Sequence, residues 1–171
     1  MYRSHSEPLV LELSGVALAS FIGDAKAATF AGTGKRTKRR DFRFYDFRRG
    51  EWDYHDGYTG NLLDTGMEVV RFHRRPVWAM VYRGGVLPDH TGDSAAIFEF
   101  LKEALRQATP DMPVRGPARY ERGVLEYVSK TDGDLYEFAG REVITANGVA
   151  VYWHSYQGGL VGDKRYRAIV S

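Results

Sequence analysis

The sequence contains no cysteine, and this absence removes several kinds of chemistry at once. No disulfide can form, no thiolate can act as a nucleophile, and no metal can be held by sulfur. A chain without cysteine suits the reducing cytosol, so we expect a cytoplasmic protein. The histidines also show no ligand spacing, and we expect neither a metal centre nor a cofactor. They are His5, His55, His73, His90 and His154.

Long apolar runs are missing too, and no stretch is long enough to cross a bilayer. Glu12 interrupts the one signal-like stretch near the N-terminus, and no positively charged leader precedes it, so we expect no signal peptide. Hydrophobic residues make up 43% of the chain and aromatic residues 13%, which excludes a disordered chain. A length of 171 residues suits a single compact domain, residues 1–171.

Positive charge is concentrated in one segment, because residues 35–49 hold eight basic and two acidic residues within a chain of net charge +2. The segment begins with Lys35, Arg36, Lys38, Arg39 and Arg40. Such a run next to aromatic residues could contact phosphates and stack on bases, so nucleic-acid binding is one interpretation. The favoured interpretation is a solvated loop, because the positive charge does not continue elsewhere in the chain.

The strongest positive signal is an internal repeat. Residues 66–89 return as residues 140–163, displaced by 74 positions without a gap, and Glu68/Glu142 and Tyr82/Tyr156 are among the identical pairs. Chance similarity of short apolar runs would not give this match. The repeat therefore predicts that the chain arose by duplication of one unit.

The hydrophobic pattern gives that unit its elements. Apolar residues at three- and four-residue spacing predict one helix from Ser14 to about Phe30 and another from about residue 91 to just before Pro110. Period-two patterns predict four strands after each helix, with a hairpin turn at Asn147-Gly148 and an exit from the sheet at Gly84-Gly85.

We therefore predict an α+β fold with two helices, about eight antiparallel strands and pseudo-twofold symmetry. Its parts would be repeat one, residues 14–89, repeat two, residues 91–163, and a C-terminal tail, residues 164–171.

Several motifs resemble domain-of-unknown-function family 5680, a bacterial family found alone or appended to helix-turn-helix regulators. They are FIGDAKAATFAGTG, GEWDYHDGYTG, PVWAMVYRGGV, FLKEALRQA and MPVRGPARYERG. The resemblance implies no activity. If such a domain accompanies a DNA-binding module, the resemblance would imply a ligand-binding sensor domain. That implication rests only on the association of the two domains in the family.

Glu68 and Glu142 are the sharpest candidates for a site. A turn at Asn147-Gly148 would set Glu142 opposite Trp153, and the same register would set Glu68 opposite Ala79. Burial in a cleft would raise the pKa of these carboxyl groups and suit them to acid/base work. The favoured interpretation is structural, with each glutamate either paired to an arginine such as Arg43 or Arg115 or capping backbone donors near Gly84 or Gly158.

The opposite strand face carries Trp78, Met80 and Tyr82, matched in the second copy by Tyr152, His154 and Tyr156. If helices cover the glutamate face, this aromatic surface is exposed and would take a partner. Alternatively it is the core face, and the glutamate face is solvated. The burial of Trp78 distinguishes the two.

We expect a binding domain more than an enzyme, with a small molecule or a partner held in a cleft where the two copies meet. Glu68 and Glu142 would orient a cationic or hydroxyl-bearing ligand. Apolar contact would come from Trp52, Tyr54, Trp78, Tyr82, Trp153 and Tyr156. The alternative is an enzyme with Glu68 or Glu142 as general acid/base and Tyr82 or Tyr156 as proton donor. The sequence specifies neither the ligand nor an oligomeric state.

Overall fold

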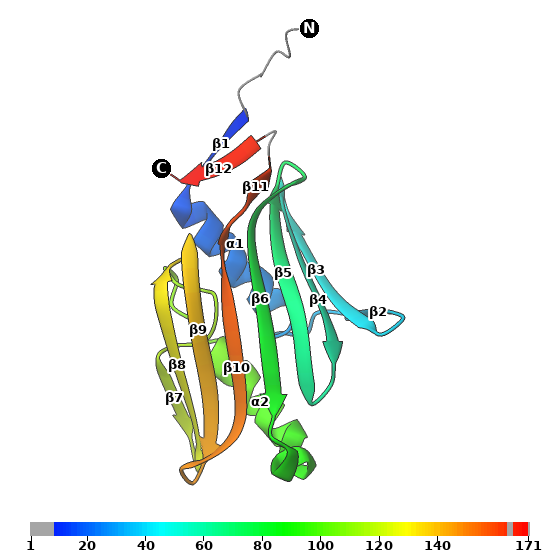
Figure 1. Ribbon diagram of the computed structural model, residues 1–171, viewed down its shortest axis with the longest axis vertical. Coiled ribbons are helices and arrows are strands. Elements are labelled where there is room, and N and C mark those ends of the chain that lie inside the picture. Colours follow the sequence, from blue (N-terminus) through cyan, green and yellow to red (C-terminus); the bar gives the residue numbers. More distant parts are fainter. Residues whose placement is uncertain (1–8, 164–165, 171) are drawn as a thin grey trace, which may run out of the picture.

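Most of the chain forms one continuous sheet in the computed structural model, which describes residues 9–163 and 166–170 (Figure 1). Nine strands follow one another in the order β2-β3-β4-β5-β6-β10-β9-β8-β7, and every neighbouring pair is antiparallel. Their bounds are β2 Thr37–Arg39, β3 Phe42–Arg49, β4 Trp52–Gly60, β5 Leu63–Phe72, β6 Arg75–Val86, β7 Arg119–Arg122, β8 Leu125–Asp134, β9 Glu137–Ala146 and β10 Val149–Leu160.

Three further strands form a separate small sheet at one end of the molecule (Figure 1). They are β1 Leu9–Leu13, β11 Gly162–Asp163 and β12 Tyr166–Val170. The parallel pairing of β1 with β12 brings the first and last described segments together. Residues 166–170 of the predicted tail are therefore a strand, while its residues 164, 165 and 171 lie outside the described part.

Both α-helices lie on the same face of the large sheet (Figure 1). Helix α1 runs Gly15–Ala28, and the Ser14 side chain caps it by accepting a hydrogen bond from the amide of Ala17 at 3.3 Å. Helix α2 runs Ser94–Leu105 and follows a 3-10 turn, η1, at Pro88–Asp93. Each helix buries an apolar stripe against the sheet. No helix in the described part of the chain is long and apolar enough to cross a membrane.

The fold class predicted from the sequence is wrong. An α+β arrangement of two helix-plus-four-strand units, with about eight strands and pseudo-twofold symmetry, is replaced by a mostly β structure built on one nine-stranded sheet. The physical reason is that β6 pairs with β10 over nine residues, from Tyr152↔Val86 to Leu160↔Trp78, so the hydrogen-bond ladder has no break between the repeated sequences.

The hairpin turns are as predicted, but the register beyond them is not. Asn147 and Gly148 both have positive φ, as a tight two-residue turn requires. One bulge interrupts each repeated hairpin, at Val77 on β6, opposite Val70 and Arg71, and at Val151 on β10, between Ala150 and Tyr152. A bulge shifts every later side chain to the other face.

The bulges therefore overturn the predicted pairing of the two glutamates. Glu68 lies opposite Met80, not Ala79, and Glu142 lies opposite His154, not Trp153. Trp78 is fully buried, so its face is the core face beneath the helices. Both glutamates consequently share the covered face with the aromatic residues.

The predicted exit at Gly84-Gly85 is also wrong, since β6 continues to Val86. Gly84 pairs with Asp64 on one side and with His154 on the other. A Cβ atom at Gly84 would overlap the Trp153 carbonyl oxygen and the His154 ring. The glycine leaves a gap through which the side chains of Asp64 and His154 reach each other across β6.

Candidate functional site

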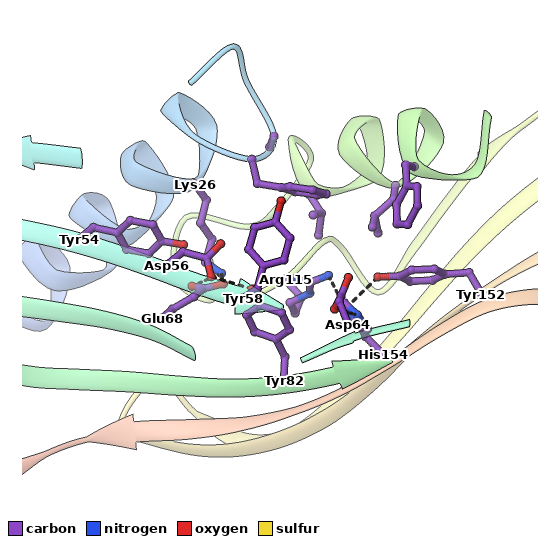
Figure 2. Close-up of a pocket in the computed structure, with 15 residues that line it drawn as sticks. Lys26, Tyr54, Asp56, Tyr58, Asp64, Glu68, Tyr82, Arg115, Tyr152 and His154 are labelled. Carbon is purple, nitrogen blue, oxygen red and sulfur yellow. Dashed lines mark hydrogen bonds and ion pairs between the residues drawn. The ribbon is translucent and has the colours of Figure 1, made fainter. Parts of the chain in front are cut away.

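A cavity lies between the helices and the covered face of the sheet (Figure 2). Its volume is about 50 Å³, which is room for about two water molecules. The helix side is apolar and is formed by Phe30, Ala31, Phe98, Leu101 and Leu105. The remaining lining is polar or titratable and consists of Lys26, Tyr54, Asp56, Tyr58, Asp64, Glu68, Tyr82, Arg115, Tyr152 and His154.

One buried ion pair supports the cavity floor. Arg115 Nε donates to Glu142 Oε2 at 2.9 Å, and a second guanidinium nitrogen donates to Oε1. The Tyr127 hydroxyl also donates to Oε2, at 2.6 Å. Burial opposes ionisation of Glu142, but Arg115 outweighs it and holds the pKa of this carboxyl far below its usual range. Glu142 is thus paired with Arg115, one of the two arginines named as possible partners in the structural interpretation of the glutamates.

A second pair joins β5 to β10 across Gly84. His154 Nε2 lies 2.9 Å from Asp64 Oδ1, and Nδ1 lies 2.8 Å from the Tyr152 hydroxyl. Burial acts to lower the pKa of His154, but its contacts with Asp64 and Glu142 outweigh burial and raise it. The Tyr152 hydroxyl in turn donates to Glu142 at 3.4 Å.

The third pair links α1 to the sheet. Lys26 Nζ donates to Glu68 Oε1 at 2.7 Å and to the Val114 carbonyl at 2.8 Å. Glu68 Oε2 lies 2.6 Å from the same nitrogen, yet no hydrogen bond satisfies it. The ammonium is within ion-pair distance of Oε2 but not in donor geometry. Burial lowers the pKa of Lys26, and the nearby Glu68 opposes that shift.

Asp56 is the carboxylate without a cation. It is directly opposite Glu68 across β4 and β5, is only 5% exposed, and accepts a hydrogen bond from the Tyr82 hydroxyl at 2.7 Å. Among the described residues, no cation forms an ion pair with it, whereas Glu68, Asp64 and Glu142 each have one. Burial, reinforced by the charge of Glu68, raises the pKa of Asp56 to about 7.

Three of the residues predicted for the site line the cavity, namely Tyr54, Glu68 and Tyr82 (Figure 2). Trp78 packs in the core and donates to the Leu135 carbonyl at 2.9 Å, and Trp52 stacks on Phe21.

The other predicted residues also lie away from the cavity lining. The Tyr156 hydroxyl bonds to Ser129 and Thr131, while Trp153 carries the Arg141 guanidinium 4.7 Å above its ring.

Residues 35–40, where the basic segment begins, form the exposed edge strand β2 and its flanks. Of the five basic residues there, Arg36 contacts the cavity lining, because its guanidinium donates to the Tyr58 hydroxyl at 3.3 Å and Tyr58 lines the cavity.

The main residue that sequence reasoning missed is Asp56. It belongs to the same period-two series as Trp52, Tyr54 and Tyr58, whose side chains point to the covered face. A carboxylate in an otherwise aromatic series is a signal for a site. Lys26, Asp64, Tyr152 and His154 come from three different elements, α1, β5 and β10, and only the three-dimensional arrangement brings them together.

The family model described as Domain of unknown function (DUF5680) matches residues 56–161. This match covers more than half of the chain, and the chain belongs to that family. Searches of the curated proteins and of the solved structures found no match. The matched range includes β4 from Asp56 onward, α2, and Arg115, Glu142 and His154.

Proposed function

We propose that this chain binds a small molecule in the cavity between the helices and the sheet. The observation that supports the proposal most is the charge buried there: three ion pairs and Asp56 surround a cavity with one apolar wall. Burying an ion costs several kcal/mol even after relaxation, and a hydrophobic replacement is often equally or more stable. Such a cluster beside a cavity is a candidate for function.

The lining favours an amphipathic ligand. An apolar part would lie against Phe98, Leu101 and Leu105 of α2, and a polar head would reach the sheet side of the cavity. Tyrosines 54, 58 and 82 present rings to that head and hydroxyl groups for hydrogen bonds. The cavity volume of about 50 Å³ limits the enclosed part to a few non-hydrogen atoms.

The enzymatic alternative has less support. A general base must be free to accept a proton, whereas Glu142 is held by Arg115 and Glu68 by Lys26. Nucleic-acid binding through residues 35–40 is a separate alternative, which a steep loss of affinity with salt would favour. The resemblance to domains that accompany helix-turn-helix regulators suits a cytoplasmic bacterial sensor whose ligand occupies the cavity.

A fragment screen by thermal shift tests the proposal. Ala31 lines the cavity and is 2% exposed, so Ala31→Leu fills the site, while Ala28→Leu on the exposed side of α1 is the control. A fragment present at 100 times its dissociation constant stabilises a protein by about 2.7 kcal/mol, which corresponds to a rise in Tm of about 5 to 11 °C.

We expect stabilising fragments that retain their effect on Ala28→Leu and lose it on Ala31→Leu. Fragments that stabilise both variants equally would place the binding site elsewhere. A broad screen with no stabilising fragment would contradict small-molecule binding itself.

A further inference from the structure

The charges around the cavity are unbalanced. Lys26 and Arg115 each form an ion pair with a glutamate and His154 bonds to Asp64, whereas Asp56 has no ion-pair partner among the described residues and accepts a hydrogen bond from the neutral Tyr82 hydroxyl. Directly opposed carboxylates on neighbouring strands repel each other, and burial strengthens the repulsion. Asp56 and Glu68 are such a pair. In the free protein, a proton on Asp56 relieves this repulsion.

We infer that the ligand of this cavity carries a protonated amine, which binds against Asp56 in place of that proton. The inference rests on the proposed function, since it specifies what the same cavity binds. A cation that replaces the proton would pair with the remaining carboxylate and restore the charge balance of the site.

Two features of the lining support an organic cation. Glu68 lies directly opposite Asp56 and lines the same cavity, so two carboxylates face the site while Lys26 forms an ion pair with only one of them. The rings of Tyr54, Tyr58 and Tyr82 also line the cavity, and aromatic faces attract cations. Among the described residues, no group of three or more acidic or histidine side chains could hold a metal ion.

Amine binding should be coupled to release of the Asp56 proton. The groups that act on this carboxyl come from every surrounding element: Glu68 on β5, Tyr82 on β6, Lys26 on α1, Arg115 before β7, Tyr54 on β4 and Tyr45 on β3. Because Asp56 titrates with a pKa of about 7, amine affinity should be about tenfold lower at pH 6 than at pH 8. About half a proton should be released per amine bound at pH 7.

Isothermal titration calorimetry with n-butylamine and benzylamine tests the inference, with 1-butanol, benzyl alcohol and butyrate as neutral and anionic comparisons. Titrations at pH 6 and pH 8, in buffers of different ionisation enthalpy, measure the released proton. Asp56→Asn removes the charge. Asp46→Asn is the control, because Asp46 has a side chain 65% exposed on neighbouring β3.

We expect the amines to bind at least tenfold more tightly than the alcohols at pH 8. Asp56→Asn should remove that preference and its pH dependence, and Asp46→Asn should change neither. Equal binding of alcohols and amines, or tighter amine binding at pH 6, overturns the inference while leaving small-molecule binding intact. If Asp56→Asn does not fold, the pH series on the unaltered protein decides the matter. Absence of binding by every fragment contradicts both proposals.

Discussion

Replacing Asp56 by asparagine should stabilise the protein above neutral pH, although the residue is buried and hydrogen-bonded. The Tyr82 hydroxyl donates a hydrogen bond to Asp56 Oδ1 at 2.7 Å, and the side-chain oxygen of an asparagine can accept the same bond. The substitution also removes the charge repulsion between Asp56 and Glu68. Burial and Glu68 raise the pKa of Asp56 from 3.8 to about 7. At about 1.4 kcal/mol per unit, the penalty for ionising this carboxyl reaches about 4 kcal/mol.

The direction of the pH effect follows from that raised pKa. The folded protein holds the Asp56 proton more tightly than the unfolded chain, so its stabilising effect is fully present below about pH 4. It is lost as the pH rises towards 7. Between about pH 4 and pH 7, Asp56 should therefore make the free energy of unfolding of the original protein fall as the pH rises. Asp56→Asn should lack that fall.

Urea unfolding at pH 5 and pH 8 measures the stability gain of the variant and its dependence on pH. We expect the free energy of unfolding of Asp56→Asn to be about 1 to 4 kcal/mol higher than that of the original protein at pH 8. At pH 5 the difference should be much smaller. The control Asp46→Asn should stay within about 0.5 kcal/mol of the original at both values. A loss of more than 1 kcal/mol in Asp56→Asn at pH 8 would refute the reasoning, because it would mean that the ionised carboxylate stabilises the fold.

Three further variants test the surrounding structure. Arg115→Met should lower the free energy of unfolding by about 3 to 5 kcal/mol because it leaves Glu142 charged and buried; a loss below about 1 kcal/mol, as expected for an exposed pair, would contradict this. Gly84→Ala should cost about 3 kcal/mol in the same urea assay because its Cβ overlaps β10. Gly92→Ala, with no neighbour within 4 Å, is its control, and equal stability of the two would exclude the steric role. Asp64→Asn should lower the pKa of His154 in an NMR titration of the ring, and an unchanged titration would exclude Asp64 as its partner.

The hairpins were the most predictable part of the fold. Asn147-Gly148 is a strong turn signal, and the matching repeat located β5 with β6 and β9 with β10. The face of each strand was not predictable, because one bulge in each hairpin reverses the alternation and no residue type marks a bulge. The extent of the sheet was hidden as well, since β6 and β10 pair over residues far apart in sequence.

The candidate site was only partly predictable for a related reason. Glu68 and Tyr82 stood out because the repeat contains them twice, but duplication preserves structural devices as readily as sites. The distinguishing residue, Asp56, lies within the motif GEWDYHDGYTG, but nothing in that motif shows that Asp56 faces Glu68 across the sheet. Asp56 stands out only because the charges around the cavity are unbalanced, and that imbalance depends on how both helices lie against the sheet.

The most direct test of the account is the titration of the Asp56 carboxyl carbon by NMR, with and without saturating n-butylamine. We expect a pKa near 7 for Asp56 in the free protein and a clear fall in that pKa when the amine is bound. An Asp56 that titrates near its ordinary value in the free protein, or a pKa that the amine leaves unchanged, would contradict it.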